Sequence, residues 1–258
     1  AVTRIYEDGS GSLWFTGDEL GLYNPETGGY THFDMMDSES TYMNSVLCSA
    51  PESRDIYIGT DWGKIFCIKG RDREIDVVYA FPEGTRIAAA RFIGDRLWVL
   101  SETKGLFVLN VREKRIEKRY DFLLQEAENK VPAKCFYVDN QSRIWIGTQQ
   151  GLYLFDPERE VHRLFTRDVK EPFSIVNNSV WTIAGDEQGN LWIGTYSGGI
   201  SSLALNETTG FDTQRLDQYG FTPRPISAFV RQGDRLWMGT EGGGLYYYDR
   251  NRGIVHGY

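Results

Sequence analysis

Aromatic rings, planar amides and guanidinium groups occur together in segments of this sequence that are predicted to be loops. Trp62 and Tyr196 supply aromatic faces, Arg86 and Arg224 supply guanidinium groups, and Asn177 supplies an amide. Such a combination suits a sugar ring, and it suits an acidic glycan if the two arginines converge. The predicted ligand-binding set comprises Trp62, Tyr196, Arg86, Arg224, Asn177, Tyr42, Glu241 and Gln149. Loop packing explains any single one of these residues equally well, so we expect one or two of them to contact a ligand.

Catalytic and metal chemistry find little support in the sequence. The acidic residues stand mostly at turns and strand ends, without the unrepeated cluster of Asp, Glu and His that bond cleavage needs. Cys48, Cys67 and Cys135 form no zinc-binding pattern and stand in apolar contexts that favour buried thiols. Aspartates in turns such as residues 8–11 suggest calcium, but Asp favours these turns for backbone reasons. We predict no catalytic residue, no metal site and no cofactor, and therefore no enzyme activity in this segment.

The charge and hydropathy of the chain argue against two classes of partner, nucleic acids and the membrane interior. With 28 Lys and Arg against 36 Asp and Glu, the formal net charge is −8, and no basic cluster predicts a nucleic-acid surface. The longest apolar runs, such as residues 106–109, fall far short of the ~20 residues that span a bilayer. Because the chain has neither an initiator Met nor a signal sequence, we interpret it as an excised segment.

One pentapeptide organises the chain. An aliphatic–aromatic–aliphatic–Gly–Thr pattern recurs every 41 to 47 residues, a period that is typical of propeller blades. The six copies are residues 13–17, 56–60, 97–101, 144–148, 191–195 and 236–240. The pattern is apolar on both faces, so neighbouring blades must cover both. We expect the aromatic residue to pack between blades and the glycine to allow another backbone to approach closely. The first and third copies depart from the pattern, and we expect these two blades to pack less regularly.

Each copy has a similar context. An apolar stretch and a polar turn precede it, and a glycine, an aromatic strand, a second turn and a fourth strand follow. The sequence therefore predicts an all-β fold, a β-propeller of four-stranded antiparallel blades with six blades in a single domain, residues 1–258. The predicted blades are residues 1–33, 45–81, 87–122, 133–165, 180–216 and 226–258. Two alternatives stay open: six blades close a ring, or they form part of a larger ring, such as one of seven blades.

The lengths of the connections distinguish the two faces of the propeller. The first-to-second and third-to-fourth turns of a blade open on one face, where short turns indicate a scaffold. The connections between blades open on the other face and are long at residues 34–44, 123–132, 166–179 and 217–225. Long loops favour this second face as the functional one. Residues 123–130 are predicted to form a short helical turn there.

The repeat resembles a known family. The pattern V-x-x-I-x-x-D-x-x-G-x-L-W-I-G-T-x-x-G-G-L-x-x-Y-D is matched best by residues 180–203 and is similar to the two-component regulator propeller repeat. This repeat occurs in extracytoplasmic sensor regions of hybrid two-component systems, with which gut Bacteroidetes detect polysaccharides. The resemblance covers the whole chain, and no recurring Gly-His or Trp-Asp dipeptide indicates WD40 units. The family has no universal ligand-contact motif, so no binding residue is carried over.

The resemblance implies a periplasmic, non-catalytic sensor that detects a polysaccharide-derived glycan and regulates its utilisation. In the family a further β domain, a membrane helix and a histidine kinase follow the propeller, so kinase activity would belong to the parent protein. The expected partners are an oligosaccharide or an adjacent propeller module, with no nucleic acid, a membrane only through the parent chain, and a homodimer in the parent. A propeller-type carbohydrate-active enzyme and a protein-interaction scaffold remain alternatives. The sequence identifies neither the ligand, nor the total number of blades, nor the dimer geometry, nor whether the site lies at a module junction.

Overall fold

The computed structural model describes residues 2–17, 20–33, 46–50, 53–70, 74–125, 132–206, 210–219, 222, 224–249 and 251–258. Regular structure in these residues is almost entirely β-strand, with one short helix, α1 (Phe122–Gln125), and one 3-10 turn, η1 (Leu216–Tyr219). The helical turn predicted within 123–130 is present as α1, and residues 126–130 of that prediction lie outside the described residues.

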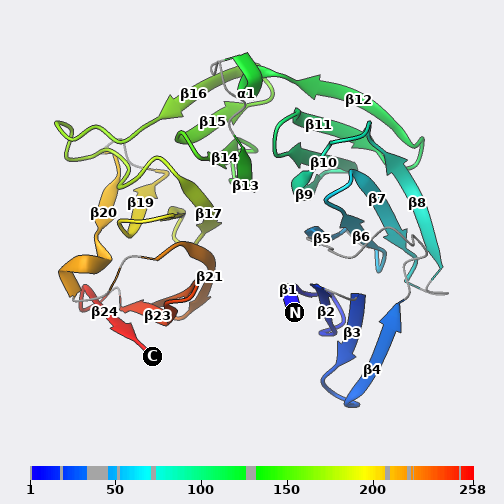
Figure 1. The fold of residues 1–258 in the computed structure, drawn as a ribbon, viewed down its shortest axis with the longest axis horizontal. Helices are drawn as coiled ribbons and strands as arrows, with labels where there is room; N and C mark the ends of the chain where they lie inside the picture. The colour runs from blue at the N-terminus through cyan, green and yellow to red at the C-terminus, as the bar shows by residue number, and fades with distance from the viewer. Residues whose placement is uncertain are drawn as a thin grey trace. The chain divides into compact units, whose positions relative to one another are not determined.

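The strands form six four-stranded antiparallel sheets, each in chain order (Figure 1). Blade 1 has β1 (Val2–Glu7), β2 (Leu13–Gly17), β3 (Leu20–Asn24) and β4 (Gly29–Phe33); blade 2 has β5 (Val46–Ser49), β6 (Ile56–Gly59), β7 (Lys64–Ile68) and β8 (Ile75–Ala80); blade 3 has β9 (Ile87–Ile93), β10 (Arg96–Ser101), β11 (Gly105–Asn110) and β12 (Arg115–Tyr120). Blade 4 has β13 (Ala133–Val138), β14 (Ile144–Thr148), β15 (Leu152–Asp156) and β16 (Val161–Phe165); blade 5 has β17 (Val180–Gly185), β18 (Asn190–Thr195), β19 (Ile200–Ala204) and β20 (Asp212–Gln214); blade 6 has β21 (Ile226–Gln232), β22 (Arg235–Thr240), β23 (Gly244–Asp249) and β24 (Ile254–Gly257). The predicted fold class, an all-β propeller with six blades in this segment, is confirmed.

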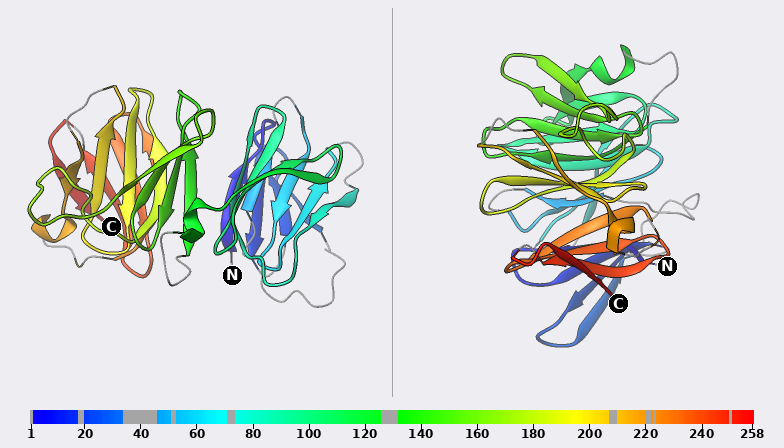
Figure 2. Two further views of the ribbon diagram at one scale, coloured as in Figure 1. Left: turned by 90° about the horizontal axis from the view of Figure 1, so that it is seen from above. Right: turned by 90° about the vertical axis from the view of Figure 1, so that its left-hand side faces the viewer.

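The chain divides into two compact units, Ala1–Lys130 with blades 1 to 3 and Val131–Tyr258 with blades 4 to 6. Within each unit the first strands of consecutive blades touch, β1 with β5 and β5 with β9 in one, β13 with β17 and β17 with β21 in the other. Figure 2 shows the three sheets of each unit standing face to face. Within each unit this stacking covers both faces of the apolar second strand of the middle blade, β6 or β18.

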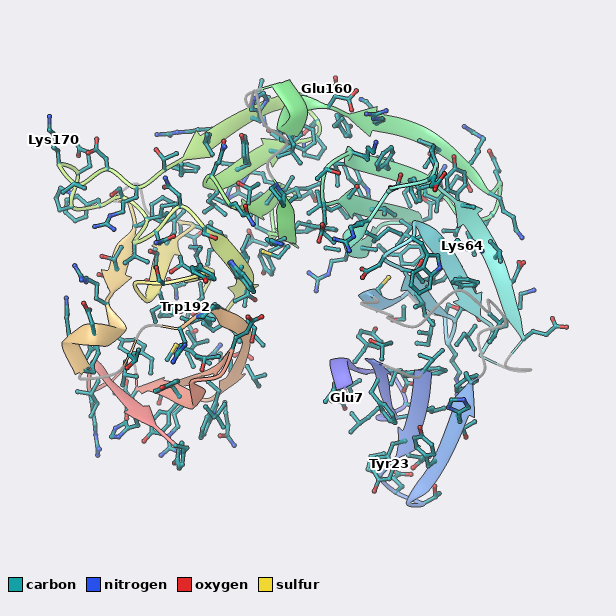
Figure 3. All side chains as sticks on the ribbon, viewed as in Figure 1. Glu7, Tyr23, Lys64, Glu160, Lys170 and Trp192 are labelled. Carbon is teal, nitrogen blue, oxygen red and sulfur yellow. The ribbon has the colours of Figure 1, made fainter. Side chains whose placement is uncertain are left out.

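The aromatic residue of the pentapeptide packs between blades, as predicted. Trp14 of blade 1 lies in one apolar cluster with Ile56 and Ile58, which are the first and third pentapeptide residues of blade 2. Trp192, labelled in Figure 3, packs in the same way with Leu236 and Met238 of blade 6. Within each unit, the following blade therefore buries the aromatic residue of the blade before it.

The pentapeptide glycine faces a side chain, so the expected approach of another backbone was wrong. A Cβ atom on Gly59 would lie 2.9 Å from Cγ2 of Ile87, and one on Gly194 would lie 2.9 Å from Cγ2 of Ile226. Ile87 and Ile226 are the first residues of β9 and β21, the first strands of the next blades. The glycine thus leaves room for a β-branched side chain from the following blade.

The pentapeptide threonine closes the second-to-third turn. The hydroxyl of Thr148 donates to the carbonyl of Gly151 at 2.9 Å, and the hydroxyl of Thr240 donates to the carbonyl of Gly244 at 2.8 Å. Thr60 and Thr195 make the corresponding bonds. Thr60, Thr148 and Thr195 are buried, and because a buried hydroxyl needs a partner, their bonds fix the turns that follow the second strands.

The copies that depart from the pentapeptide behave differently from one another. Leu97 and Val99 in blade 3 are fully buried. In blade 1 the corresponding residues, Leu13 and Phe15, are only half-buried. Trp237 of blade 6 is also half-buried, whereas the other five aromatic residues of the repeat are buried.

All three cysteines are free thiols. Cys48 and Cys67 are buried, as predicted, whereas Cys135 is half-buried. Burial raises the pKa of Cys48 to about 12, so this thiol stays protonated at neutral pH.

Candidate ligand-binding surface

The turns between second and third strands place equivalent residues of different blades on one face. Gln149, Tyr196 and Glu241 each follow the pentapeptide threonine directly, and their side chains are exposed. Their backbone N–H groups donate to the carbonyls of Pro132 at 3.3 Å, Ser179 at 2.8 Å and Pro225 at 3.0 Å, respectively. Those carbonyl residues immediately precede β13, β17 and β21, so each turn is tied to the connection that enters its own blade.

An aromatic pair lies at one of these turns. The ring of Tyr196 lies 5.5 Å from that of Trp181 on β17, with an interplanar angle of 40°. The indole N–H of Trp181 donates to Oγ of Ser179 at 3.1 Å, and Nζ of Lys134 lies 5.7 Å from the Trp181 ring centre. Tyr196 remains 51% exposed, so it offers an aromatic face to a ligand.

Asn177 lies beside this pair. Its Nδ2 donates to Oγ of Ser197 at 3.3 Å, and its Oδ1 accepts the backbone N–H of Ser179 at 2.8 Å. The connection that carries Asn177 is anchored nearby, because the N–H of Val176 donates to the buried Oγ of Ser201 at 2.9 Å. We call the surface formed by Trp181, Tyr196, Lys134, Asn177 and Ser197 the aromatic patch.

The structure brings together two of the predicted site residues, Tyr196 and Asn177. Trp181 was missed, although a signal existed: like Trp62, it is a tryptophan outside the pentapeptide. Trp62 packs partly buried against the apolar cluster of blades 1 and 2, as the loop-packing alternative expected. Tyr42 lies outside the described residues.

The two predicted arginines belong to different units, Arg86 to the first and Arg224 to the second. The side chain of Arg86 is 62% exposed, and its Nη1 lies 3.8 Å from Oε2 of Glu102. Arg224 is exposed and packs its aliphatic part over Gly243. Each arginine therefore remains a separate candidate within its own unit.

Aspartates in the first-to-second turns stabilise the fold by accepting hydrogen bonds. Asp8, Asp139 and Asp186 each accept the indole N–H of the tryptophan six residues later, at 2.7, 2.9 and 2.9 Å. Each also accepts backbone N–H groups of its own turn. Across the described residues, no group of three or more His, Cys, Asp or Glu side chains is arranged to hold a metal ion.

Hydrogen bonding also shifts the acidity of one of these aspartates. Partial burial on its own raises the pKa of Asp8, but hydrogen bonds from Ser10, Trp14 and the turn backbone outweigh burial. The pKa of Asp8 therefore lies below its ordinary value of 3.8, and the carboxylate is ionised at neutral pH.

A family model and a curated relative both match this chain. Residues 174–197 match the two component regulator propeller family. The chain is 25% identical over 249 residues to histidine kinase P4 of Formosa agariphila, an alignment that covers 89% of this chain and 18% of the kinase. The chain thus spans less than a fifth of the length of this curated relative.

Solved structures share the fold. The extracellular domain of a hybrid two-component system from B. thetaiotaomicron matches 100% of this chain and 36% of its own, with a TM-score of 0.80 and 17% identity. A second such domain from the same organism matches 95% of this chain and 39% of its own, with a TM-score of 0.58 and 18% identity. A virginiamycin B lyase from Staphylococcus aureus matches 95% of this chain and 78% of its own, with a TM-score of 0.73 and 14% identity.

No helix among the described residues has the length and apolar character needed to cross a membrane. The aromatic patch lies largely within the segment that matches the family, since Asn177, Trp181, Tyr196 and Ser197 fall in residues 174–197. The chain is a propeller segment of six four-stranded blades, and one stretch of it, residues 174–197, matches the two component regulator propeller family.

Proposed function

We propose that this chain is the ligand-sensing propeller of a hybrid two-component signalling protein, and that it detects a polysaccharide-derived glycan outside the cytoplasm. The family match and the curated kinase relative support the signalling role. Likeness to extracellular domains supports a periplasmic location. Kinase activity belongs, in this proposal, to other parts of the parent protein, which also supply the membrane anchor and the homodimer.

The observation that carries the glycan proposal is the aromatic patch. The exposed face of Tyr196, 5.5 Å from Trp181, gives a sugar ring an apolar platform. The nearby Asn177 amide, Ser197 hydroxyl and Lys134 ammonium provide the polar groups that orient sugar hydroxyls. The turn and the anchored connection hold these groups in place before a ligand arrives.

Binding transmits a signal only if the ligand binds one arrangement of the parent protein more tightly than another. The patch joins a second-to-third turn of blade 5 to the connection entering that blade and to β13 of blade 4. A glycan on this surface therefore contacts two neighbouring blades, and it stabilises the spacing between them.

The experiment is thermal unfolding of the 258-residue chain in the presence of plant, host and microbial oligosaccharides. A ligand that binds the folded state raises the unfolding midpoint. We expect the shift to disappear in Tyr196→Ala and to persist in the control Tyr30→Ala, whose tyrosine is 52% exposed on β4 in the other unit. The proposal fails if no oligosaccharide moves the midpoint, or if Tyr196→Ala keeps the full shift.

A further inference from the structure

A cavity of about 480 Å³ opens in the first unit, where the short turns of blades 1 and 2 meet. Blade 1 contributes its first-to-second turn and Asn24, and blade 2 contributes Ser49, Ser53, Arg54 and the start of its third-to-fourth turn. This size lies within the range of small-molecule sites. Sequence analysis predicted that the face with the first-to-second and third-to-fourth turns is a scaffold, so this cavity was not predicted.

The floor of the cavity is apolar and rigid. Trp14, Leu22, Ile56 and Ile68 line it, and all four are buried members of one core cluster. Packed side chains of this kind keep their positions when a ligand enters. A floor that includes an indole edge and branched aliphatic groups suits the C–H surface of a sugar-sized ring.

The polar walls offer hydrogen-bond donors. Asn24 uses its Oδ1 to accept the N–H groups of Glu26 and Thr27, and its Nδ2 has no acceptor among the described residues. Ser53 accepts the N–H of Asp55 with its Oγ, which leaves its O–H able to donate. The Asp8 carboxylate, in contrast, already accepts four hydrogen bonds from Ser10, Ser12 and Trp14.

Two positively charged side chains line the cavity. Arg54 and Lys69 are exposed lining residues, and neither forms an ion pair within the described part of the chain. Their turns are joined, because Oδ1 of Asp55 accepts the N–H of Gly70 at 3.0 Å. Hydrogen bonds from Lys114 lower the pKa of Asp76, and the charge of Lys69 adds to this effect without forming an ion pair. Arg54 and Lys69 are therefore free to meet a ligand.

We propose that this cavity binds a sugar-sized anion, with its carboxylate or sulfate group at Arg54 and Lys69 and its ring on the floor that contains Trp14. The unpaired cations recognise the negative charge, while Asn24 and Ser53 donate to ring hydroxyls. The site is separate from the aromatic patch and involves different blades, so its test does not depend on the proposed glycan surface.

The test is calorimetric titration of the 258-residue chain with galacturonate, galactose 6-sulfate and galactose. We expect at least one of the two anions to bind and neutral galactose not to bind. The two anions distinguish a carboxylate site from a sulfate site. In Arg54→Gln and in Lys69→Gln we expect the affinity to fall about tenfold, as removal of a charged hydrogen bond predicts.

A matched control is Arg112→Gln. Arg112 is exposed in the third-to-fourth turn of blade 3 and, within the described part of the chain, makes no ion pair. Its replacement removes one positive charge from the same unit and should not change affinity. The proposal is overturned if neither anion binds at millimolar concentration, if galactose binds as well as the anions, or if Arg112→Gln weakens binding as much as Arg54→Gln.

Discussion

Single residues do several structural jobs at once in this repeat. An aspartate in the first-to-second turn caps its own turn and also holds the indole of the next strand, so the turn and the inter-blade core depend on each other. Such a buried, fully bonded carboxylate explains why the acidic turns are scaffold elements. The same network gives two predictions at this scale.

Replacing Asp139 with Ala should lower the free energy of unfolding by about 2 to 3 kcal/mol, because several donors lose a charged acceptor. These include the N–H groups of Gln141 and Arg143 and the indole N–H of Trp145. The matched control is Asp95→Ala, which removes a turn aspartate whose side chain is 69% exposed and forms an ion pair with Arg96. Urea unfolding measures both, and equal losses would contradict the account.

Asp8 should make stability depend on pH. Its pKa in the folded state lies below 3.8, so folding favours the ionised form. The resulting stabilisation is present above the unfolded pKa and is lost as the pH falls through the folded pKa. We expect the urea midpoint to drop between about pH 5 and pH 3, and to drop less in Asp8→Asn. Other carboxyls with lowered pKa also contribute, namely Asp76, Glu117, Asp156 and Asp217. An identical drop in both proteins would show that Asp8 has no part in it.

At the scale of elements, the repeated strand is a connector between blades. Within a unit, its aromatic residue is covered by the next blade, and its glycine receives the first side chain of that blade. Gly239 of blade 6 differs, since the nearest atom to a Cβ there would be that of Ala228 in its own blade, at 3.8 Å. This contrast supplies a paired test.

Gly194→Ala should destabilise the chain by about 1 to 3 kcal/mol, because the added methyl group overpacks a filled site. Its Cβ would lie 2.7 Å from Cγ2 of Thr182 and 2.9 Å from Cγ2 of Ile226. Gly239→Ala, which meets no such neighbour, should leave stability unchanged or slightly raised. Thermal unfolding of the two variants decides this, and equal destabilisation would contradict the proposed packing.

Sequence periodicity was sufficient to predict the blades, because a strand that is apolar on both faces has few other places in a fold. The position of Tyr196 was also predictable, since it follows a repeated threonine. Trp181 was not identified, because an aromatic residue within a strand looks like core until its exposed neighbour is seen. The cavity at Trp14 was not foreseen either, because it is formed by short turns that come from two different blades.

At the scale of the whole molecule, the blades of each unit bury apolar faces against neighbouring blades of that unit, as in other repeat proteins. Such a stack suits sensing, because a ligand that binds to two neighbouring blades stabilises the contact between those blades. If the chain is a sensor and not an enzyme, incubation with polysaccharides should release no new reducing ends. Steady release by the purified chain, abolished by boiling, would instead favour the enzyme alternative.

The central claim is that a glycan binds at the aromatic patch, and hydrogen–deuterium exchange tests it most directly. The chain is incubated with and without pooled plant, host and microbial oligosaccharides, and backbone exchange is compared along the sequence. We predict slower exchange in residues 174–182 and 195–199, where Asn177, Trp181 and Tyr196 lie. Unchanged exchange in these two segments, with or without protection elsewhere, would contradict the claim.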